Sequence, residues 1–383
     1  MRVFEFRLTE AAQPLTEAWK RVAVAPRGEA LLGISFRPLQ AEAFGLDLPA
    51  TLKMLLQYPF DLIRLGAYWN RMEPKDGAFL PDELDRQIEA AEEAGKKIIV
   101  CLGPVKTFGY PEFFVPAHHL SRPFREGTRI RPADHPALLE AAIAHIARLV
   151  ERYGKHESIV AWQLEHEAVD PLGVEHSWRL DAEWVRGEVE ALRRADTTRP
   201  IMMNGFLPTT LPVRVTQGWS TRDQGDSLDV ARRFANIVGI DYYPRNALTS
   251  FGSKTLYLDG TESRTQEKRL DELRAWARRS DRRLMVSEGQ AEPWETATTP
   301  PSPGGRSMYS CPPDAVITNY NHWMSPQWDG PSLYAYLFWG AEYWVHRLQG
   351  GDSSYLDAFA RVLEDSGRQP AYGAAEGEWS VST

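Results

Sequence analysis

Three ionisable side chains stand in a row at Glu165, His166 and Glu167, in the segment AWQLEHEAVDP. Such a group is compatible with a metal site, a salt-bridge cluster, or one half of a carboxylate pair that performs acid–base chemistry. A further carboxylate, Glu288, follows the apolar run of the segment RLMVSEG. The elements that position these residues must decide between the three interpretations.

Short apolar runs alternate with longer stretches of helical periodicity about eight times along the chain. The runs predict strands at 31–36, 61–68, 96–103, 158–165, 200–205, 236–243, 283–289 and 332–339. The clearest amphipathic helices are predicted at 81–95, 136–154, 181–195 and 355–365. Because the strands are continuously apolar, we expect parallel strands that are buried on both faces. The predicted fold is α/β, a single (β/α)8 TIM barrel.

The barrel is expected over residues 31–383, including a C-terminal tail. Residues 1–30 are expected to form an N-terminal extension, a strand or loop that caps the bottom of the barrel. The segments after the third, fifth, sixth and seventh strands are long and rich in Pro, Gly and aromatic residues. In a barrel such segments build the C-terminal face, where the active site lies.

Composition excludes several function classes. The net charge is -8 and the arginines are scattered, so no nucleic-acid partner is expected. The two cysteines, Cys101 and Cys311, lack metal-ligand spacing. No apolar run reaches the length of a signal peptide or a membrane span, so we expect a cytoplasmic protein with no membrane partner. The oligomeric state stays open, and a homo-oligomer is compatible with the sequence.

The fourth and seventh strands would deliver their terminal acids to the same mouth of the barrel. Strict alternation puts Gln163, Glu165 and Glu167 on one face, so alternation does not choose between the two glutamates. A lone Glu at a strand end is more often a rim salt bridge or a helix cap. Here Glu288 and one of the two glutamates follow buried strands, where an unpaired charge is costly, and this favours a functional pair.

These segments resemble clan A, the retaining β-glycosidases that are built on (β/α)8 barrels. WQLEHE is similar to the W-Q-x-[DE]-N-E signature of β-galactosidase-like members, and VSEG is similar to the strand end that carries the nucleophile. IRLGAYWNRMEPKDGAF resembles the stretch in which an arginine ends the second strand. The resemblance extends over about residues 31 to 366. It implies that Glu167 is the acid/base and Glu288 the nucleophile.

The resemblance also implies contacts to the sugar. The expected substrate-binding residues are Arg64, His166, Asn204, Tyr243, Trp294 and Trp339. His166 stands where the clan has an asparagine that hydrogen-bonds the 2-hydroxyl of the sugar, an interaction that strengthens in the transition state. Histidine can donate as well, but with a different reach.

The expected activity is hydrolysis of β-linked oligosaccharides or small glycosides by double displacement, with no cofactor and no metal. Galactose is slightly favoured over mannose and glucose. One alternative is a metal-dependent sugar isomerase with Glu165, His166, Glu167 and His176 as ligands. Adjacent residues on a strand point to opposite faces, which disfavours that site. Another alternative is a non-catalytic carbohydrate-binding barrel.

Other ionisable residues have simpler interpretations. His118 and His119 are expected to be solvated residues of the third loop. Glu292 and Glu295 are expected to be rim charges. Asp241 ends a strand and is a plausible contact to the sugar.

Overall fold

Eight parallel strands close into a barrel in the order β10-β13-β15-β3-β4-β5-β7-β9 in the computed structural model of the chain. The structure describes residues 6–367, apart from 76, 170–177, 209–210, 212–213, 216–218, 220–223, 253, 261–262, 298–304 and 325–332. The barrel strands are β3 (Leu31–Ser35), β4 (Leu62–Gly66), β5 (Lys97–Cys101), β7 (Ile159–Gln163), β9 (Ile201–Phe206), β10 (Ile237–Tyr242), β13 (Arg283–Gln290) and β15 (Ala335–Trp339). All eight predicted strands are present, and the predicted (β/α)8 barrel is confirmed.

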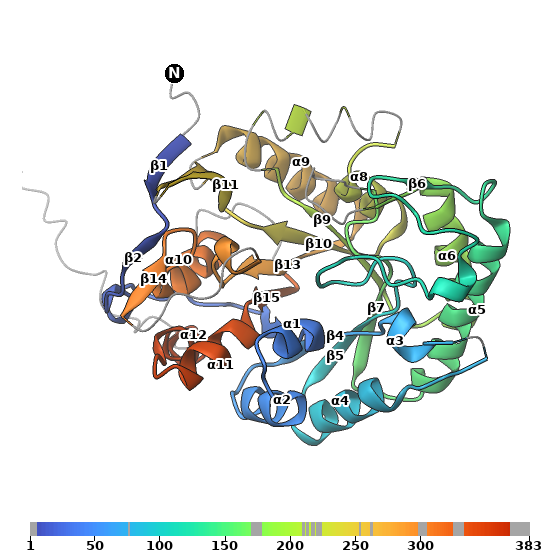
Figure 1. Ribbon diagram of the computed structural model, residues 1–383, viewed down its shortest axis with the longest axis horizontal. Coiled ribbons are helices and arrows are strands. Elements are labelled where there is room, and N and C mark those ends of the chain that lie inside the picture. The colour runs from blue at the N-terminus through green and yellow to red at the C-terminus, as the bar shows by residue number, and fades with distance from the viewer. Residues whose placement is uncertain are drawn as a thin grey trace, which may run out of the picture.

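Helices surround the barrel (Figure 1). They are α1 (Pro38–Ala43), α2 (Leu48–Leu56), α3 (Trp69–Met72), α4 (Asp82–Glu93), α5 (Pro136–Tyr153), α6 (Ala182–Ala195), α8 (Ser227–Phe234), α9 (Arg264–Ser280), α10 (Pro313–Met324), α11 (Ala341–Gln349) and α12 (Ser354–Asp365). Helix α4 shows why the sequence predicted the helices: Leu84, Ile88 and Ala91 recur at helical spacing and share one buried face. Gly95 follows this helix with φ of 68°, a conformation that favours glycine.

The interior of the barrel changes from apolar to polar along the strands. One layer is entirely apolar and contains Leu62, Ile99, Ala161, Met202, Ile237, Met285, Ala335 and Leu337. Two residues further along three of these strands, the same inward positions hold Arg64, Gln163 and Asn204, which are all buried. The packed apolar layer therefore forms a floor, and the polar layer above it lies at the C-terminal ends of the strands.

Short strands and 3-10 turns follow the C-terminal ends of the barrel strands. After β10 comes a hairpin of β11 (Arg245–Phe251) and β12 (Lys254–Asp259), and after β13 come η3 (Trp294–Ala297) and β14 (Arg306–Met308). The segment after β5 contains η2 (Ala117–His119) and β6 (Arg129–Ile130), and β6 pairs with β8 (Arg179–Leu180). These are the segments in which the sequence predicted long functional loops.

The N-terminal extension pairs with two of these segments. The strand β1 (Phe6–Glu10) pairs with β12, and β2 (Ala12–Pro14) pairs with β14. A short 3-10 turn, η1 (Ala18–Lys20), follows. Residues 6–14 therefore lie beside the segments that follow β10 and β13, whereas Arg27 pairs with Asp61, just before β4 begins. In the described part of the chain, no helix is long and apolar enough to cross a bilayer.

Candidate active site

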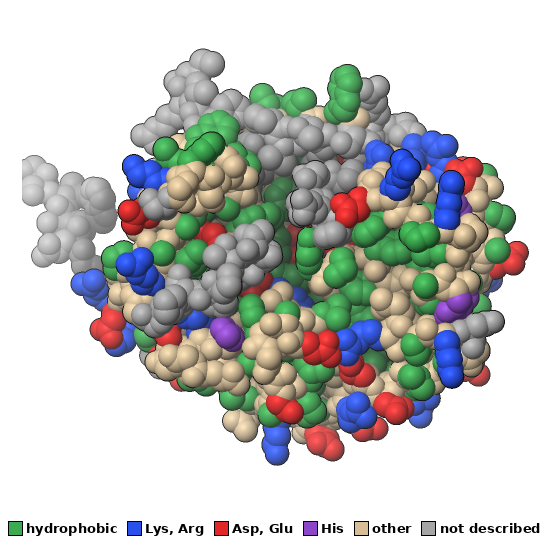
Figure 2. Space-filling model, viewed as in Figure 1, with side chains coloured by type: hydrophobic (Ala, Val, Ile, Leu, Met, Phe, Trp, Pro, Cys, Tyr) green, Lys and Arg blue, Asp and Glu red, His purple; other side chains and the backbone are tan. Residues whose placement is uncertain are grey.

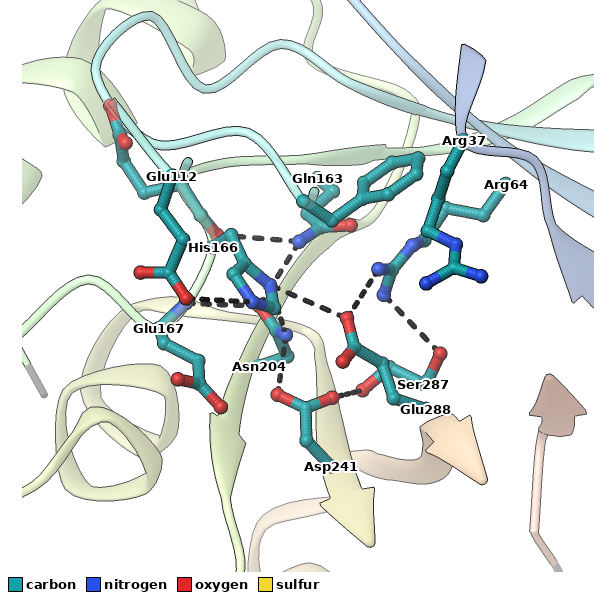
Figure 3. A network of polar contacts seen from close by, with 12 residues as sticks. Arg37, Arg64, Glu112, Gln163, His166, Glu167, Asn204, Asp241, Ser287 and Glu288 are labelled. Carbon is teal, nitrogen blue, oxygen red and sulfur yellow. Dashed lines mark hydrogen bonds and ion pairs between the residues drawn. The ribbon is translucent and has the colours of Figure 1, made fainter. Parts of the chain in front are cut away.

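A buried polar network fills the C-terminal end of the barrel (Figure 3). Asn204 on β9 is its centre. Its Oδ1 accepts a hydrogen bond from Gln163 Nε2 at 3.0 Å, and its Nδ2 donates to Asp241 Oδ2 at 2.6 Å. The hydroxyl of Ser287 donates to the other oxygen of Asp241 at 2.7 Å. Asn204 thus lies at the mouth of the barrel, and Asp241 belongs to the same network.

Glu288 reaches this network because β13 contains one extra residue. Val286 pairs with Ile240, but the next pair joins Glu288 to Asp241, so Ser287 is bulged out of register. The bulge lets both Ser287 and Glu288 contact the interior, which simple alternation would forbid. The side chain of Glu288 is 3 % exposed.

Both oxygens of Glu288 have a strong hydrogen-bond donor. Arg64 Nη2 lies 2.5 Å from Oε1, and the hydroxyl of Tyr243 donates to Oε2 at 2.6 Å. Arg64 itself is completely buried, and its guanidinium lies 4.0 Å from the centre of the Phe108 ring. The structure thus brings together Arg64, Tyr243 and Glu288, three residues that the resemblance to clan A singled out.

The charge state of Glu288 is governed by burial more than by its two hydrogen-bond donors. Burial, and then the neighbouring Asp241 carboxylate, raise the pKa of Glu288 to about 8. Arg64 and Tyr243 lower that pKa, but they do not offset the loss of hydration. Ionisation of Glu288 is therefore expected to occur near the alkaline side of neutrality.

The segment that follows β7 separates the two candidate glutamates. Alternation ends at Gln163, because Glu165 and Glu167 both have left-handed backbone conformations, with φ of 49° and 42°. Glu165 turns aside and accepts hydrogen bonds from the backbone N–H groups of Val105 (3.1 Å) and Lys106 (2.5 Å). Glu165 is therefore occupied by the segment that follows β5.

Glu167 remains beside the central network. Its backbone N–H lies 3.4 Å from Asn204 Oδ1, and its side chain lies near enough to Asp241 to affect the pKa of that carboxyl. Figure 3 shows Glu167 and Glu288 on opposite sides of the pair formed by His166 and Asn204. The residue is 6 % exposed. Of the two glutamates that alternation left undecided, Glu167 is the one that faces Glu288.

A second carboxyl lies against Glu165 and was not identified from the sequence. Glu188 on α6 is fully buried and accepts a hydrogen bond from Trp184 Nε1 at 2.7 Å. Burial raises the pKa of Glu165 to about 7, and burial together with the Glu165 charge raises the pKa of Glu188 well above its ordinary value. Because the backbone donors favour a charged Glu165, Glu188 carries the proton of this pair.

His166 is a neutral imidazole of defined tautomer. Burial, followed by the positive charges of Arg64 and Lys106, holds its pKa well below the ordinary value of 6.5. Asn204 Nδ2 donates to Nδ1 at 2.9 Å, because Asn204 Oδ1 is already occupied as an acceptor. The proton of His166 is therefore on Nε2.

Nε2 of His166 faces a charged pair that the sequence did not reveal. Glu112 Oε1 lies 3.9 Å from this nitrogen, and Glu112 Oε2 lies 3.1 Å from the ammonium of Lys106. Lys106 is fully buried and also donates to the backbone carbonyl of Glu167 at 2.6 Å. Both residues belong to the segment after β5. Glu112 lies within the aromatic stretch GYPEFF (109–114), and Lys106 lies just before it.

Aromatic rings line the rest of the mouth. Trp294 contacts Tyr243 edge-on with 5.6 Å between ring centres, and Phe206 stacks near Tyr243 at 6.3 Å. Trp339 ends β15 and lies under the guanidinium of Arg37 at 4.3 Å. All six predicted substrate-binding residues therefore lie at one end of the barrel. Figure 2 shows a hollow near the centre of the molecule, over the barrel strands of Figure 1.

Buried charged residues lie behind the aromatic rings that line the mouth. Arg37 is buried and forms ion pairs with Glu292 at 2.7 Å and with Glu342 at 2.7 Å. The prediction that Glu292 is a structural charge agrees with this contact. Glu295 is likewise buried and accepts hydrogen bonds from Tyr257 and Ser310.

The metal site considered from the sequence does not form as drawn. Glu165 is directed to the backbone of Val105 and Lys106, away from His166 and Glu167. The fourth suggested ligand, His176, lies outside the described residues.

Comparisons with known proteins point to one class. Residues 48–179, about a third of the chain, match the family model described as β-galactosidase of glycoside hydrolase family 42. None of the curated proteins matches the chain significantly.

Solved structures share the fold over most of the chain. A GH5_18 enzyme from Streptomyces cattleya in complex with GlcNAc is 15% identical, with a TM-score of 0.55 over 91% of this chain and 83% of that one. An alanine variant of GH5_18 from Bifidobacterium longum in complex with Manβ1-4GlcNAc is 12% identical, with a TM-score of 0.59 over 88% and 78%. A β-galactosidase from the haloarchaeon Halorubrum lacusprofundi is 14% identical, with a TM-score of 0.53 over 89% and 58%.

The fold, the polar mouth and the family match point to the same class. As predicted, the chain resembles the glycoside hydrolases of the clan A (β/α)8 type, in sequence over residues 48–179 and in fold over most of its length. Within this class, the matched segment fits the β-galactosidase-like enzymes and contains both Arg64 and Glu167.

Proposed function

We propose that the protein is a retaining β-glycosidase in which Glu288 is the nucleophile and Glu167 is the acid/base. The observation that carries this proposal is the arrangement of the two carboxylates around His166 and Asn204. Glu288 is fixed by Arg64 and Tyr243 on one side, and Glu167 lies on the other side. For a double displacement, the proposal requires the carboxyl groups of Glu167 and Glu288 to be about 5–5.5 Å apart when the substrate is bound.

In the first step, Glu167 protonates the glycosidic oxygen while Glu288 attacks the anomeric carbon. The bond to the leaving group breaks, and an ester bond forms between the sugar and Glu288. The two donors on Glu288 orient its oxygens, and the attacking oxygen must exchange one of these bonds for the new covalent bond.

In the second step, Glu167 removes a proton from water, and the water oxygen attacks the anomeric carbon. The ester bond breaks, Glu288 becomes a carboxylate again, and the sugar leaves with its original β configuration. Both transition states carry positive charge on the sugar ring. A neutral His166 does not repel that charge, and its Nε2–H can donate to a sugar hydroxyl.

The substrate is proposed to be a β-linked oligosaccharide or a small β-glycoside. A galactoside is favoured because the matched family model is described as β-galactosidase. A mannoside is the next candidate, since two of the similar structures contain Manβ1-4GlcNAc. Activity on a panel of nitrophenyl β-galactoside, β-mannoside and β-glucoside ranks these sugars directly. The cytoplasmic location remains a prediction from the sequence.

Azide rescue tests the two assigned roles. The Glu167→Ala variant should still be glycosylated by an aryl glycoside with a good leaving group, and azide should then release a β-glycosyl azide. The Glu288→Ala variant cannot form the intermediate, so azide should displace the leaving group directly and give the α product. Exchanged product configurations would reverse the assignment. Activity close to the wild type in either variant would refute the proposed site.

A further inference from the structure

Two histidines and one glutamate converge outside the site described above. Glu73 follows α3, and His118 and His119 lie in η2, which is 45 and 46 residues further along the chain. The Nε2 atoms of both imidazoles approach the same carboxylate oxygen, Glu73 Oε1, at 3.0 and 2.9 Å. Both histidines are open to solvent, as expected for this loop, but each also contacts Glu73.

We propose that Glu73, His118 and His119 form a structural site for a divalent transition-metal ion of the zinc type. Two imidazoles and one carboxylate are a ligand set that zinc accepts, with a fourth position left for water. The three ligand atoms lie within 4.8 Å of one another. Bonds of about 2.0–2.2 Å to a tetrahedral ion would separate them by roughly 3.3–3.6 Å. The two Nε2–Oε1 distances, 3.0 and 2.9 Å, would have to lengthen by about half an ångström to reach that range.

The carboxylate is oriented by a group behind it, as metal ligands usually are. The indole N–H of Trp69 donates to Glu73 Oε2 at 3.0 Å and leaves Oε1 for the imidazoles. The Trp69 ring is completely buried and also packs on the His119 ring, with 4.7 Å between ring centres. One buried side chain therefore holds two of the three ligands in place.

Solvent can reach the cluster. The side chains of His118 and His119 are 22% and 21% exposed, whereas that of Glu73 is 10% exposed. An ion can therefore enter from the side of η2, and a water molecule can complete its coordination. The guanidinium of Arg148 lies nearby, 3.9 Å from Glu73 Oε2, and its positive charge opposes a bound cation.

Such an ion would connect two segments that support the candidate active site. The segment after β5 carries Lys106 and Glu112, which face His166, and η2 is a later part of the same segment. Binding to Glu73 would anchor this segment to the end of α3. The ion is assigned a structural role, and the glycosidase chemistry proposed above does not depend on it.

Binding of Zn²⁺ alone, followed by isothermal titration calorimetry and elemental analysis, tests the site. The wild-type protein, stripped with a chelator, should take up one tightly bound Zn²⁺ per chain and show a higher Tm. Co²⁺ in its place should give the visible absorption of a four-coordinate ion. The double variant His118→Ala/His119→Ala should bind Zn²⁺ at least about 100-fold more weakly. Loss of a group that only orients a ligand already costs about 10–100-fold in affinity, and this variant removes two ligands.

Three further variants make the result specific. Glu73→Gln keeps the shape of the side chain and should also abolish tight binding. It therefore tests the site even if the double variant folds poorly. His156→Ala is the matched control, because His156 pairs with Glu92 at 2.9 Å but is not part of a three-ligand cluster among the described residues. Arg148→Met removes the opposing charge and should tighten Zn²⁺ binding several-fold, an effect that a purely hydrogen-bonded cluster would not produce.

Two outcomes would overturn the proposal. One is that the stripped wild-type protein binds no Zn²⁺ at micromolar concentration. The other is that the His118→Ala/His119→Ala and Glu73→Gln variants keep the full stoichiometry, which would place the ion elsewhere in the protein. Glycosidase activity does not enter either criterion, so failure here is distinguishable from failure of the proposed function.

Discussion

The amide of Asn204 lies 2.9 Å from Nδ1 of His166, and this contact decides which imidazole nitrogen carries the proton. Asn204 cannot turn around, because its Oδ1 accepts from Gln163 and its Nδ2 donates to Asp241. His166 is thus held as a neutral donor at Nε2, in the position where the resembling enzymes have an asparagine.

The ¹⁵N spectrum of His166 should therefore not titrate across the neutral range. Its pKa is held well below 6.5 by burial and by the charges of Arg64 and Lys106. We expect the chemical shifts of the Nε2–H tautomer at every pH from about 5 to 8, in contrast to a histidine of ordinary pKa near 6.5. An imidazolium signal that appears as the pH falls through about 6.5 would contradict the assigned charge state.

The pH profile of kcat/KM should have an acid limb that follows Glu288. Its pKa of about 8 is raised above the ordinary value, so the anion that attacks the sugar accumulates only as the pH rises through that range. Tyr243→Phe removes a donor that lowers this pKa and should move the limb to higher pH. Activity at neutral pH should then fall about tenfold for every pH unit that the limb moves. Asp241→Asn removes a charge that raises the pKa and should move the limb to lower pH.

The neighbouring Tyr242→Phe provides the matched control for these two variants. Tyr242 is buried but stacks on His322, with 5.1 Å between ring centres. The acid limb of the Tyr242→Phe pH profile should coincide with that of the wild type. Movement of the limb in the same direction for Tyr243→Phe and Asp241→Asn would argue against Glu288 as the titrating group.

Glu165→Gln should retain substantial activity, whereas Glu167→Gln should lose about 10²–10⁴-fold on substrates with poor leaving groups. Glu165 accepts its hydrogen bonds from the backbone of Val105 and Lys106, and an amide oxygen can accept one of them. Steady-state kinetics on an unactivated β-glycoside make the comparison. Equal losses in the two variants would mean that Glu165 takes part in the chemistry.

Glu188→Gln should reduce the loss of thermal stability at alkaline pH. The raised pKa values of Glu165 and Glu188 mean that the folded state holds a proton which the unfolded chain releases near pH 4.5. This stabilisation is complete below that pH and is lost as the pH rises through the raised pKa values of the pair, of which that of Glu165 is about 7. With one carboxyl replaced by a permanent donor, the Tm should fall less between about pH 6 and pH 9. Glu190→Gln, an exposed change on the same helix, should follow the wild-type curve.

Gly103→Ala should destabilise the protein by about 1–3 kcal/mol and lower its activity. A Cβ atom at this position would lie 2.6 Å from the backbone nitrogen of Glu165 and 2.6 Å from the carbonyl oxygen of Lys106. The turn that directs Glu167 would have to shift. Gly187→Ala is the control, since its Cβ would meet only ordinary contacts with Leu139 in a helix. Chemical denaturation and kinetics on both variants provide the measurement.

The sequence predicted the strands well because eight continuous apolar runs leave little choice of secondary structure or of fold class. Through the resemblance to a family it also singled out Arg64, Tyr243 and Glu288, which contact one another in the structure. Alternation could not select Glu167 over Glu165, because the chain leaves the strand conformation after Gln163 and two left-handed residues follow. Local pattern does not contain that information.

Long-range partners were missed for a related reason. Lys106 and Glu112 face His166 from a segment some 60 residues earlier, and Glu188 meets Glu165 from the following helix. No periodicity links such positions. The same holds for Glu73 and the two histidines of η2, whose separation in sequence hid a three-residue cluster from a search for ligand spacing.

The extra residue in β13 makes the candidate active site sensitive to chain length. If the bulge were lost and Ser287 paired regularly with Asp241, Glu288 would pair with Tyr242 and its side chain would turn out of the barrel. Glu288 would then no longer be held between Arg64 and Tyr243, even though the amino acids of the site would be unchanged. Single-residue insertions and deletions in this strand should therefore be far less tolerated in the lineage of this protein than those in the loops that carry its aromatic side chains.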